Sequence, residues 1–90
     1  MTVYALTKHT HASHHYPTDR TEFKGIYDSI EKAWEAIEHD YYPLLKNIEE
    51  LKYKIRGVRI NSCGLTIEYE KFFEDLYFCE MFDILETEVQ

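Results

Sequence analysis

The chain has 90 residues, of which 44% are hydrophobic and 16% aromatic, and its formal net charge at pH 7 is −7. This length predicts a single domain covering residues 1–90. The lack of a long apolar run argues against a membrane-spanning helix, and the excess of acidic residues argues against direct binding to nucleic acid.

Two cysteines, Cys63 and Cys79, are too few for a disulfide scaffold. The N-terminal residues also lack the basic, apolar and small segments of a signal peptide. We therefore expect reduced thiols and a cytoplasmic location, which is the host cytoplasm if a phage encodes the chain.

The first third of the chain predicts two antiparallel strands. Residues Val3–Lys8 are rich in strand-forming side chains, and so are residues Glu22–Tyr27. The polar stretch between them, His9–Arg20, contains Pro17 and has no apolar period. It is therefore expected to form a long loop.

The main helix is predicted over Asp28–Tyr42. Asp28 has the side chain of an N-cap, and Glu31 follows at the spacing of a capping box. One helical face collects the apolar residues Ile30, Ala33, Trp34, Ile37 and Tyr41. Pro43 lacks an N–H and disfavours helical geometry at Tyr42, so it predicts the end of the helix or a sharp bend.

The segment after the helix predicts a short second helix followed by a hairpin. Residues Tyr41–Leu51 place apolar side chains at helical spacing. Residues Tyr53–Ile60 alternate apolar and basic residues, with a bulge expected at Gly57. A turn over Asn61–Gly64 leads into the strand Leu65–Tyr69.

The last element, within Phe72–Leu85, fits neither period cleanly, because Asp83 breaks the helical face and Glu80 breaks the strand alternation. Aromatic content favours a strand, and a helix stays open as the alternative. The sequence thus predicts an α+β fold, with an antiparallel sheet of four or five strands and the main helix on one face, in the order β-β-α-(short α)-β-β-β. The expected core is Val3, Ala5 or Leu6, Ile26, Ile30, Trp34, Ile37, Ile48, Ile55, Val58, Ile60 and Ile67.

The run Gly25-Ile-Tyr-Asp-Ser-Ile-Glu-Lys-Ala33, preceded by a Val-Tyr-Ala-Leu strand, resembles the β-β-α unit of small uncharacterised bacterial and phage proteins. The resemblance covers residues 1–40. It implies the β-β-α arrangement and brings no activity or site residues with it.

A histidine cluster is the first candidate site. His9, His11, His14 and His15 lie within seven residues, and imidazoles from such a segment can bind Zn²⁺, Ni²⁺ or Cu²⁺. The alternatives are a solvated loop without function and a pH-sensitive contact.

An acidic, aromatic C-terminal segment is the second candidate site. Residues 67–90 hold eight acidic residues and one basic residue, Lys71. Carboxylates along a sheet edge can imitate the phosphates of DNA, and exposed aromatic rings can anchor a partner. The residues expected to bind a partner are Glu68, Glu70, Phe72, Phe73, Glu74, Asp75, Tyr77 and Glu80. The alternative is a solvated acidic surface that maintains solubility.

The sequence contains no catalytic motif and only three glycines, so we expect no enzyme activity. The function expected is a small acidic binding protein. In its most specific form it is a phage or mobile-element inhibitor, similar to anti-CRISPR proteins. Such an inhibitor would occupy the basic nucleic-acid-binding surface of a defence or nucleic-acid enzyme by DNA mimicry. The alternatives are a metal-binding module at the histidine cluster and a structural or antitoxin-like interaction protein that dimerises through a sheet edge.

Overall fold

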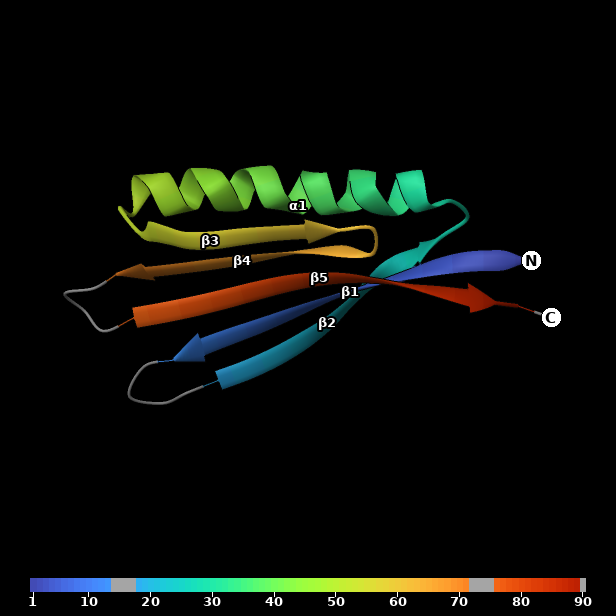
Figure 1. Ribbon diagram of the computed structural model, residues 1–90, viewed down its shortest axis with the longest axis horizontal. Helices are drawn as coiled ribbons and strands as arrows, with labels where there is room; N and C mark the ends of the chain where they lie inside the picture. Colours follow the sequence, from blue (N-terminus) through green and yellow to red (C-terminus); the bar gives the residue numbers. More distant parts are fainter. Residues whose placement is uncertain (14–17, 72–75, 90) are drawn as a thin grey trace.

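Five antiparallel strands form one sheet with a single helix along one of its faces (Figure 1) in the computed structural model, which describes residues 1–13, 18–71 and 76–89. The elements in chain order are β1 Thr2–Ser13, β2 Thr18–Tyr27, α1 Ile30–Glu50, β3 Lys54–Asn61, β4 Gly64–Lys71 and β5 Leu76–Glu88. The α+β class is therefore confirmed. The order differs from the predicted one because a single helix replaces the predicted two.

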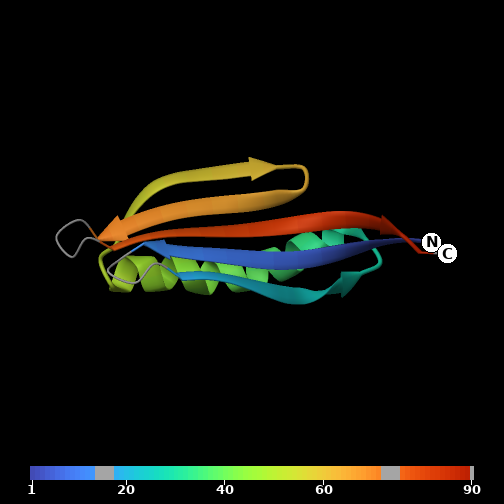
Figure 2. The ribbon, with the colours of Figure 1, turned by 90° about the horizontal axis from the view of Figure 1, so that it is seen from below.

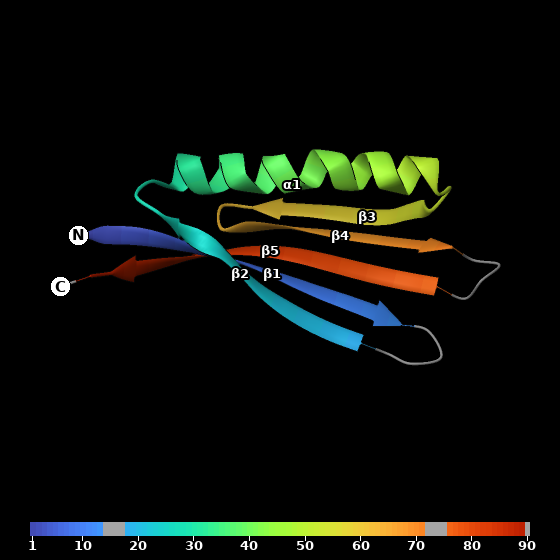
Figure 3. The same ribbon diagram turned by 180° about the vertical axis from the view of Figure 1, so that it is seen from behind.

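The spatial order of the strands is β2-β1-β5-β4-β3. Figure 2, which looks at the sheet from the side away from the helix, shows β3 and β2 as the two edge strands. Strands β1 and β2 form one hairpin, β3 and β4 form another, and β5 lies between the two hairpins, paired with β1 and β4. The two ends of the chain lie side by side at one end of the sheet (Figures 1 and 3).

The long loop predicted over His9–Arg20 is wrong for most of its length. Strand β1 continues to Ser13, β2 begins at Thr18, and the pairing of the two strands extends to Ala12 and Thr18. These polar residues form a strand because β1 is paired on both sides, with β2 and with β5. Its backbone hydrogen bonds stabilise the extended conformation, although the side chains have a low propensity for strands.

The N-cap of α1 is Ser29 and not the predicted Asp28. Ser29 Oγ accepts a hydrogen bond from the N–H of Lys32 at 3.2 Å. Asp28 lies outside the helix and forms an ion pair with Lys32 Nζ at 2.9 Å. Its carboxyl pKa is therefore lowered, mainly by the hydrogen bond from Lys32.

The predicted helix end at Tyr42 is wrong, because α1 continues through Pro43 to Glu50. Proline removes one backbone hydrogen bond from a helix interior. Packing outweighs that loss here, since Leu44, Leu45 and Ile48 continue the apolar stripe against the sheet.

The helix ends in a Schellman motif that aims Tyr53 at the sheet. The N–H of Lys52 donates to the carbonyl of Glu49 at 3.2 Å, and the N–H of Tyr53 donates to that of Ile48 at 3.0 Å. Lys52 adopts the left-handed conformation, with φ +61°. This conformation is strained for a residue with a side chain.

Replacing Lys52 with glycine is expected to raise the free energy of unfolding by about 1 kcal/mol, because glycine adopts the left-handed conformation without strain. The measurement is urea unfolding of both proteins. The control is Lys52→Ala, which removes the charge and keeps the strain. An equal gain in the alanine variant would assign the effect to the charge and contradict the conformational explanation.

The core lies between α1 and the three central strands. Its buried residues are Leu6, Ala33, Ile37, Ile48, Leu65, Ile67, Tyr69, Phe82 and Ile84. This confirms Leu6, Ile37, Ile48 and Ile67 from the predicted core, and Ile30 and Trp34 are partly buried against it.

The remaining core predictions, apart from Ala5 as the alternative to the confirmed Leu6, are wrong for two reasons. Ile55, Val58 and Ile60 face the helix side of the sheet, but they lie on the edge strand β3 and stay 41%, 41% and 68% exposed. Val3, Ala5 and Ile26 lie on the opposite face of the sheet, where no layer of the described chain covers them. This face is called the open face below.

Candidate functional site

The open face has an apolar end built from strands β2, β1 and β5. Ile26, Ala5 and Leu85 form one row across the three strands. Phe23 lies in the next row, opposite Thr7. Phe23, Ile26 and Leu85 are 65%, 62% and 67% exposed. With Val3, these residues make up the apolar end of the open face.

The other end of the open face is polar and charged. On β4, Glu68 and Glu70 form ion pairs with Arg59 and Arg56 of β3, at 3.3 Å and 2.9 Å. The pKa of Arg56 is raised, chiefly by its hydrogen bond to Glu70. Glu68 and Glu70 are thus each matched by an arginine on the neighbouring strand.

The described part of the chain does not bring the predicted acidic residues onto one surface. Glu68, Glu70 and Tyr77 lie on the open face. Glu80 points to the opposite side and is buried, at 5% exposure, so its assignment as a partner contact is wrong. Phe72, Phe73, Glu74 and Asp75 lie outside the described residues.

Glu80 belongs to an internal polar network under the helix. Its carboxylate forms an ion pair with Lys8 Nζ at 3.0 Å and accepts a hydrogen bond from the Tyr69 hydroxyl at 2.6 Å. Burial, followed by this hydrogen bond, raises the pKa of Tyr69 well above its ordinary value. Both carboxylate oxygens are satisfied, which is why an acid can replace an apolar residue in the inward alternation of β5.

The histidine cluster lies partly on the same open face. His11 Nδ1 lies 2.8 Å and His9 Nε2 3.3 Å from the same carboxylate oxygen of Asp19 on β2. The hydrogen bond with His11 is the largest effect lowering the pKa of Asp19. Within the described residues no group of three or more His, Cys, Asp or Glu side chains is placed to hold a metal ion. His14 and His15 lie outside those residues, so the metal site stays a prediction.

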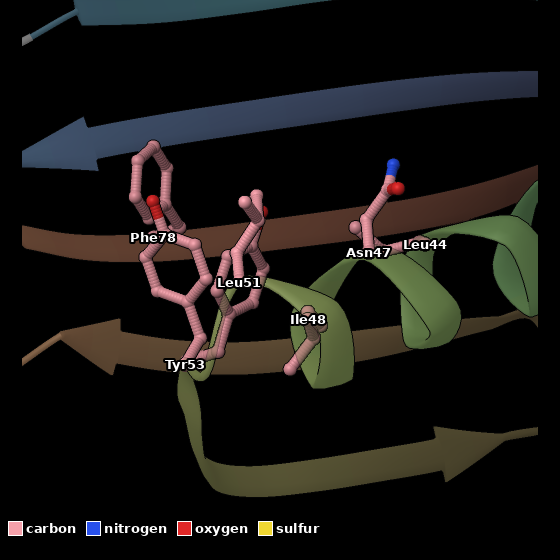
Figure 4. A pocket seen from close by; sticks show the side chains of 7 residues that line it. Leu44, Asn47, Ile48, Leu51, Tyr53 and Phe78 are labelled. Carbon is pink, nitrogen blue, oxygen red and sulfur yellow. The ribbon is translucent and has the colours of Figure 1, made fainter.

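A small apolar cavity of about 170 Å³ opens where the last turn of α1 meets the sheet (Figure 4). Leu44, Asn47, Ile48 and Leu51 supply the helix wall. Tyr53, Tyr69 and Phe78 supply the aromatic wall. Tyr69 and Phe78 stack with their centroids 5.1 Å apart, and Tyr53 meets both edge-on. The cavity has the size and lining of an anchor site for one apolar group and carries no ionisable acid–base pair.

The two cysteines are free thiols with different surroundings. Burial raises the pKa of the Cys79 thiol, which opposes thiolate formation. Cys63 is exposed in the β3–β4 turn, 3.6 Å from the Ser62 hydroxyl. Within the described residues, neither thiol forms a hydrogen bond or an ion pair with a histidine or a lysine.

Sequence reasoning missed the apolar end of the open face. Simple alternation would place Phe23 and Ile26 on opposite faces, and the register shift between Leu6 and Thr7 in the β1–β2 pairing brings them onto one. Counting Ile26 as core also concealed the apolar end. No helix in the described part of the chain has both the length and the apolar character needed to cross a membrane. Comparison of the chain with known protein families, with curated proteins and with solved structures found no match.

Proposed function

We propose that the protein is a small acidic, non-catalytic binding protein that holds a protein partner against the apolar end of its open face. The observation that carries this proposal is the exposure of Phe23, Ile26 and Leu85 on three adjacent strands. A contiguous apolar patch on a small protein is typical of an interaction site. Large side chains at its centre are the usual source of binding energy.

The expected partner is cationic. A net charge of −7 attracts basic surfaces over a long range and accelerates encounter. The most specific form of the proposal is a phage or mobile-element inhibitor that covers the basic nucleic-acid-binding surface of a defence or nucleic-acid enzyme.

The apolar end supports this contact better than the acidic segment does. Mimicry of phosphates requires unpaired carboxylates, but Glu68 and Glu70 are neutralised by arginines on β3 and Glu80 is buried. The charge therefore steers the encounter, and the apolar end supplies the contact.

Capture from a host lysate tests the proposal with two matched variants. Ile26→Lys places a charge on the apolar end. Tyr42→Lys places the same charge on the outer face of α1, and both positions are 62% exposed. We expect the unmodified protein and Tyr42→Lys to retain the same protein, and Ile26→Lys to lose it. Retention should weaken as salt is raised, since screening reduces attraction between charged surfaces.

The inhibitor form is tested on the retained protein itself. If it is an enzyme that handles nucleic acid, adding the unmodified protein should prevent its binding to nucleic acid, and Ile26→Lys should not. Equal capture by all three proteins would reject the apolar end as the contact. If light scattering shows a homodimer and Ile26→Lys abolishes it, the open face binds a second copy of the chain. That result would also reject the proposal.

A further inference from the structure

Strand β3 is an edge strand whose outer side is open. In the described chain it pairs with β4 alone. Alternate residues of an edge strand therefore direct backbone N–H and C=O groups outward, where another strand can bind them. The strand contains no proline, and its eight residues span about 26 Å.

The two faces of β3 differ sharply in chemistry. On the helix side, Ile55, Val58 and Ile60 form an exposed apolar row. On the open face, β3 carries only basic charged residues, Lys54, Arg56 and Arg59. Lys54 forms no ion pair within the described residues. Arg56 and Arg59 are exposed, and each forms its ion pair with β4 through one guanidinium nitrogen.

The inner neighbour of β3 shows which kind of strand fits this edge. Strand β4 places Leu65, Ile67 and Tyr69 opposite the apolar row. It places Glu68 and Glu70 against the arginines. One strand of alternating apolar and acidic residues already occupies one side of β3. The other side offers the same apolar row, the amine of Lys54, and the guanidinium N–H groups of Arg56 and Arg59 that are not used toward β4.

We propose that the outer edge of β3 is a docking site for an extended segment of a partner protein in which acidic and apolar residues alternate. The segment joins the sheet as a sixth strand next to β3. Backbone hydrogen bonds supply affinity, and the two rows of side chains set the register and the specificity. This site is separate from the apolar end of the open face, which lies on strands β2, β1 and β5.

A second copy of the chain fits this edge poorly. Antiparallel pairing of two β3 strands would bring Lys54, Arg56 and Arg59 against the same cations, and like charges on facing strands are destabilising. The register shift between Ile55 and Gly57 also bends the edge away from flat self-pairing. Although the whole chain is acidic, screening over about 8 Å at physiological ionic strength leaves the nearby charges to decide a contact, and here three cations of β3 face two acids of β4.

Nuclear magnetic resonance titration tests the proposal with a synthetic peptide of residues 64–71 as the probe. This peptide should shift the amide resonances of β3 and slow hydrogen exchange of its outward amides. A peptide with lysine in place of both glutamates should bind about tenfold more weakly, because attraction to the cations becomes repulsion. Resonance changes confined to β4 or β5 would mean that the peptide replaces the native strand β4. That result would reject the addition of a sixth strand.

Two exposed isoleucines give matched variants for this titration. Ile60→Lys changes the apolar row of β3, and Ile26→Lys makes the same change on the open face at β2. We expect Ile60→Lys to abolish peptide binding and to leave capture of the lysate partner unchanged, and Ile26→Lys to do the reverse. Equal binding of both peptides, self-association through β3, or stronger β3 shifts with an oligonucleotide would each overturn the proposal.

Discussion

Replacing Glu80 with alanine is expected to lower the free energy of unfolding by about 3 kcal/mol, because it leaves the Lys8 amine and the Tyr69 hydroxyl without their buried partner. For a domain of this size such a loss lowers the melting temperature by more than about 10 °C. Chemical unfolding and a thermal melt, both followed by circular dichroism, measure the two quantities.

Two variants distinguish the loss of stability caused by breaking the buried network from the effect of removing any acidic side chain. Asp83→Ala removes an exposed acid from the same strand and should change stability by less than about 0.5 kcal/mol. Combining Glu80→Leu with Lys8→Met and Tyr69→Phe replaces the whole network with apolar groups, and it should restore most of the stability lost in Glu80→Ala. A loss below about 1 kcal/mol in Glu80→Ala would mean that water reaches Lys8 and Tyr69, and would contradict the buried network.

Replacing Gly64 with alanine is expected to destabilise the protein by about 3 kcal/mol. Gly64 is buried at the start of β4, and a β-carbon there would collide with the backbone carbonyl oxygen of Phe82. Phe82 is fully buried in the neighbouring strand β5, so its backbone can move only if the core repacks.

Gly57→Ala is the matched control for Gly64→Ala. A β-carbon at Gly57 meets no atom within 4 Å, although Gly57 lies in the adjacent strand β3. Its effect should stay within about 0.5 kcal/mol, and a small gain is expected because alanine restricts the unfolded chain. Urea unfolding of the two variants measures the difference. Equal stabilities would contradict the close approach of β4 and β5 at Gly64.

The class of fold was predictable because it rests on local patterns. The apolar period from Ile30 to Tyr41 predicts a helix, and alternation in Leu65–Tyr69 predicts a strand. Proline chemistry at Pro43 was misleading, because the packing of Leu44 and Ile48 that overrides it is a tertiary effect.

The candidate site was harder to predict because it depends on which faces and edges the topology covers. Ile26 and Ile67 both lie in strands in which apolar and polar residues alternate. Ile67 is buried because α1 covers its face of the sheet, and Ile26 is exposed because it lies on the other face. The inward position of Glu80 depends on Lys8, which lies far from it in sequence and two positions off in the strand register. A count of acidic residues along the chain does not reveal such a partner.

The order of synthesis conflicts with the central position of β5. The hairpins β1–β2 and β3–β4 are complete once residue 71 has been made, but β5, made last, must enter between them. Until then two unjoined hairpins have no common sheet, and isolated hairpins are marginally stable. We therefore expect the complete sheet to form only after β5 has been made, and the many pairings between distant residues should make its folding slow. A nascent chain stalled before β5 would expose the inner edges of both hairpins to chaperones and to other chains.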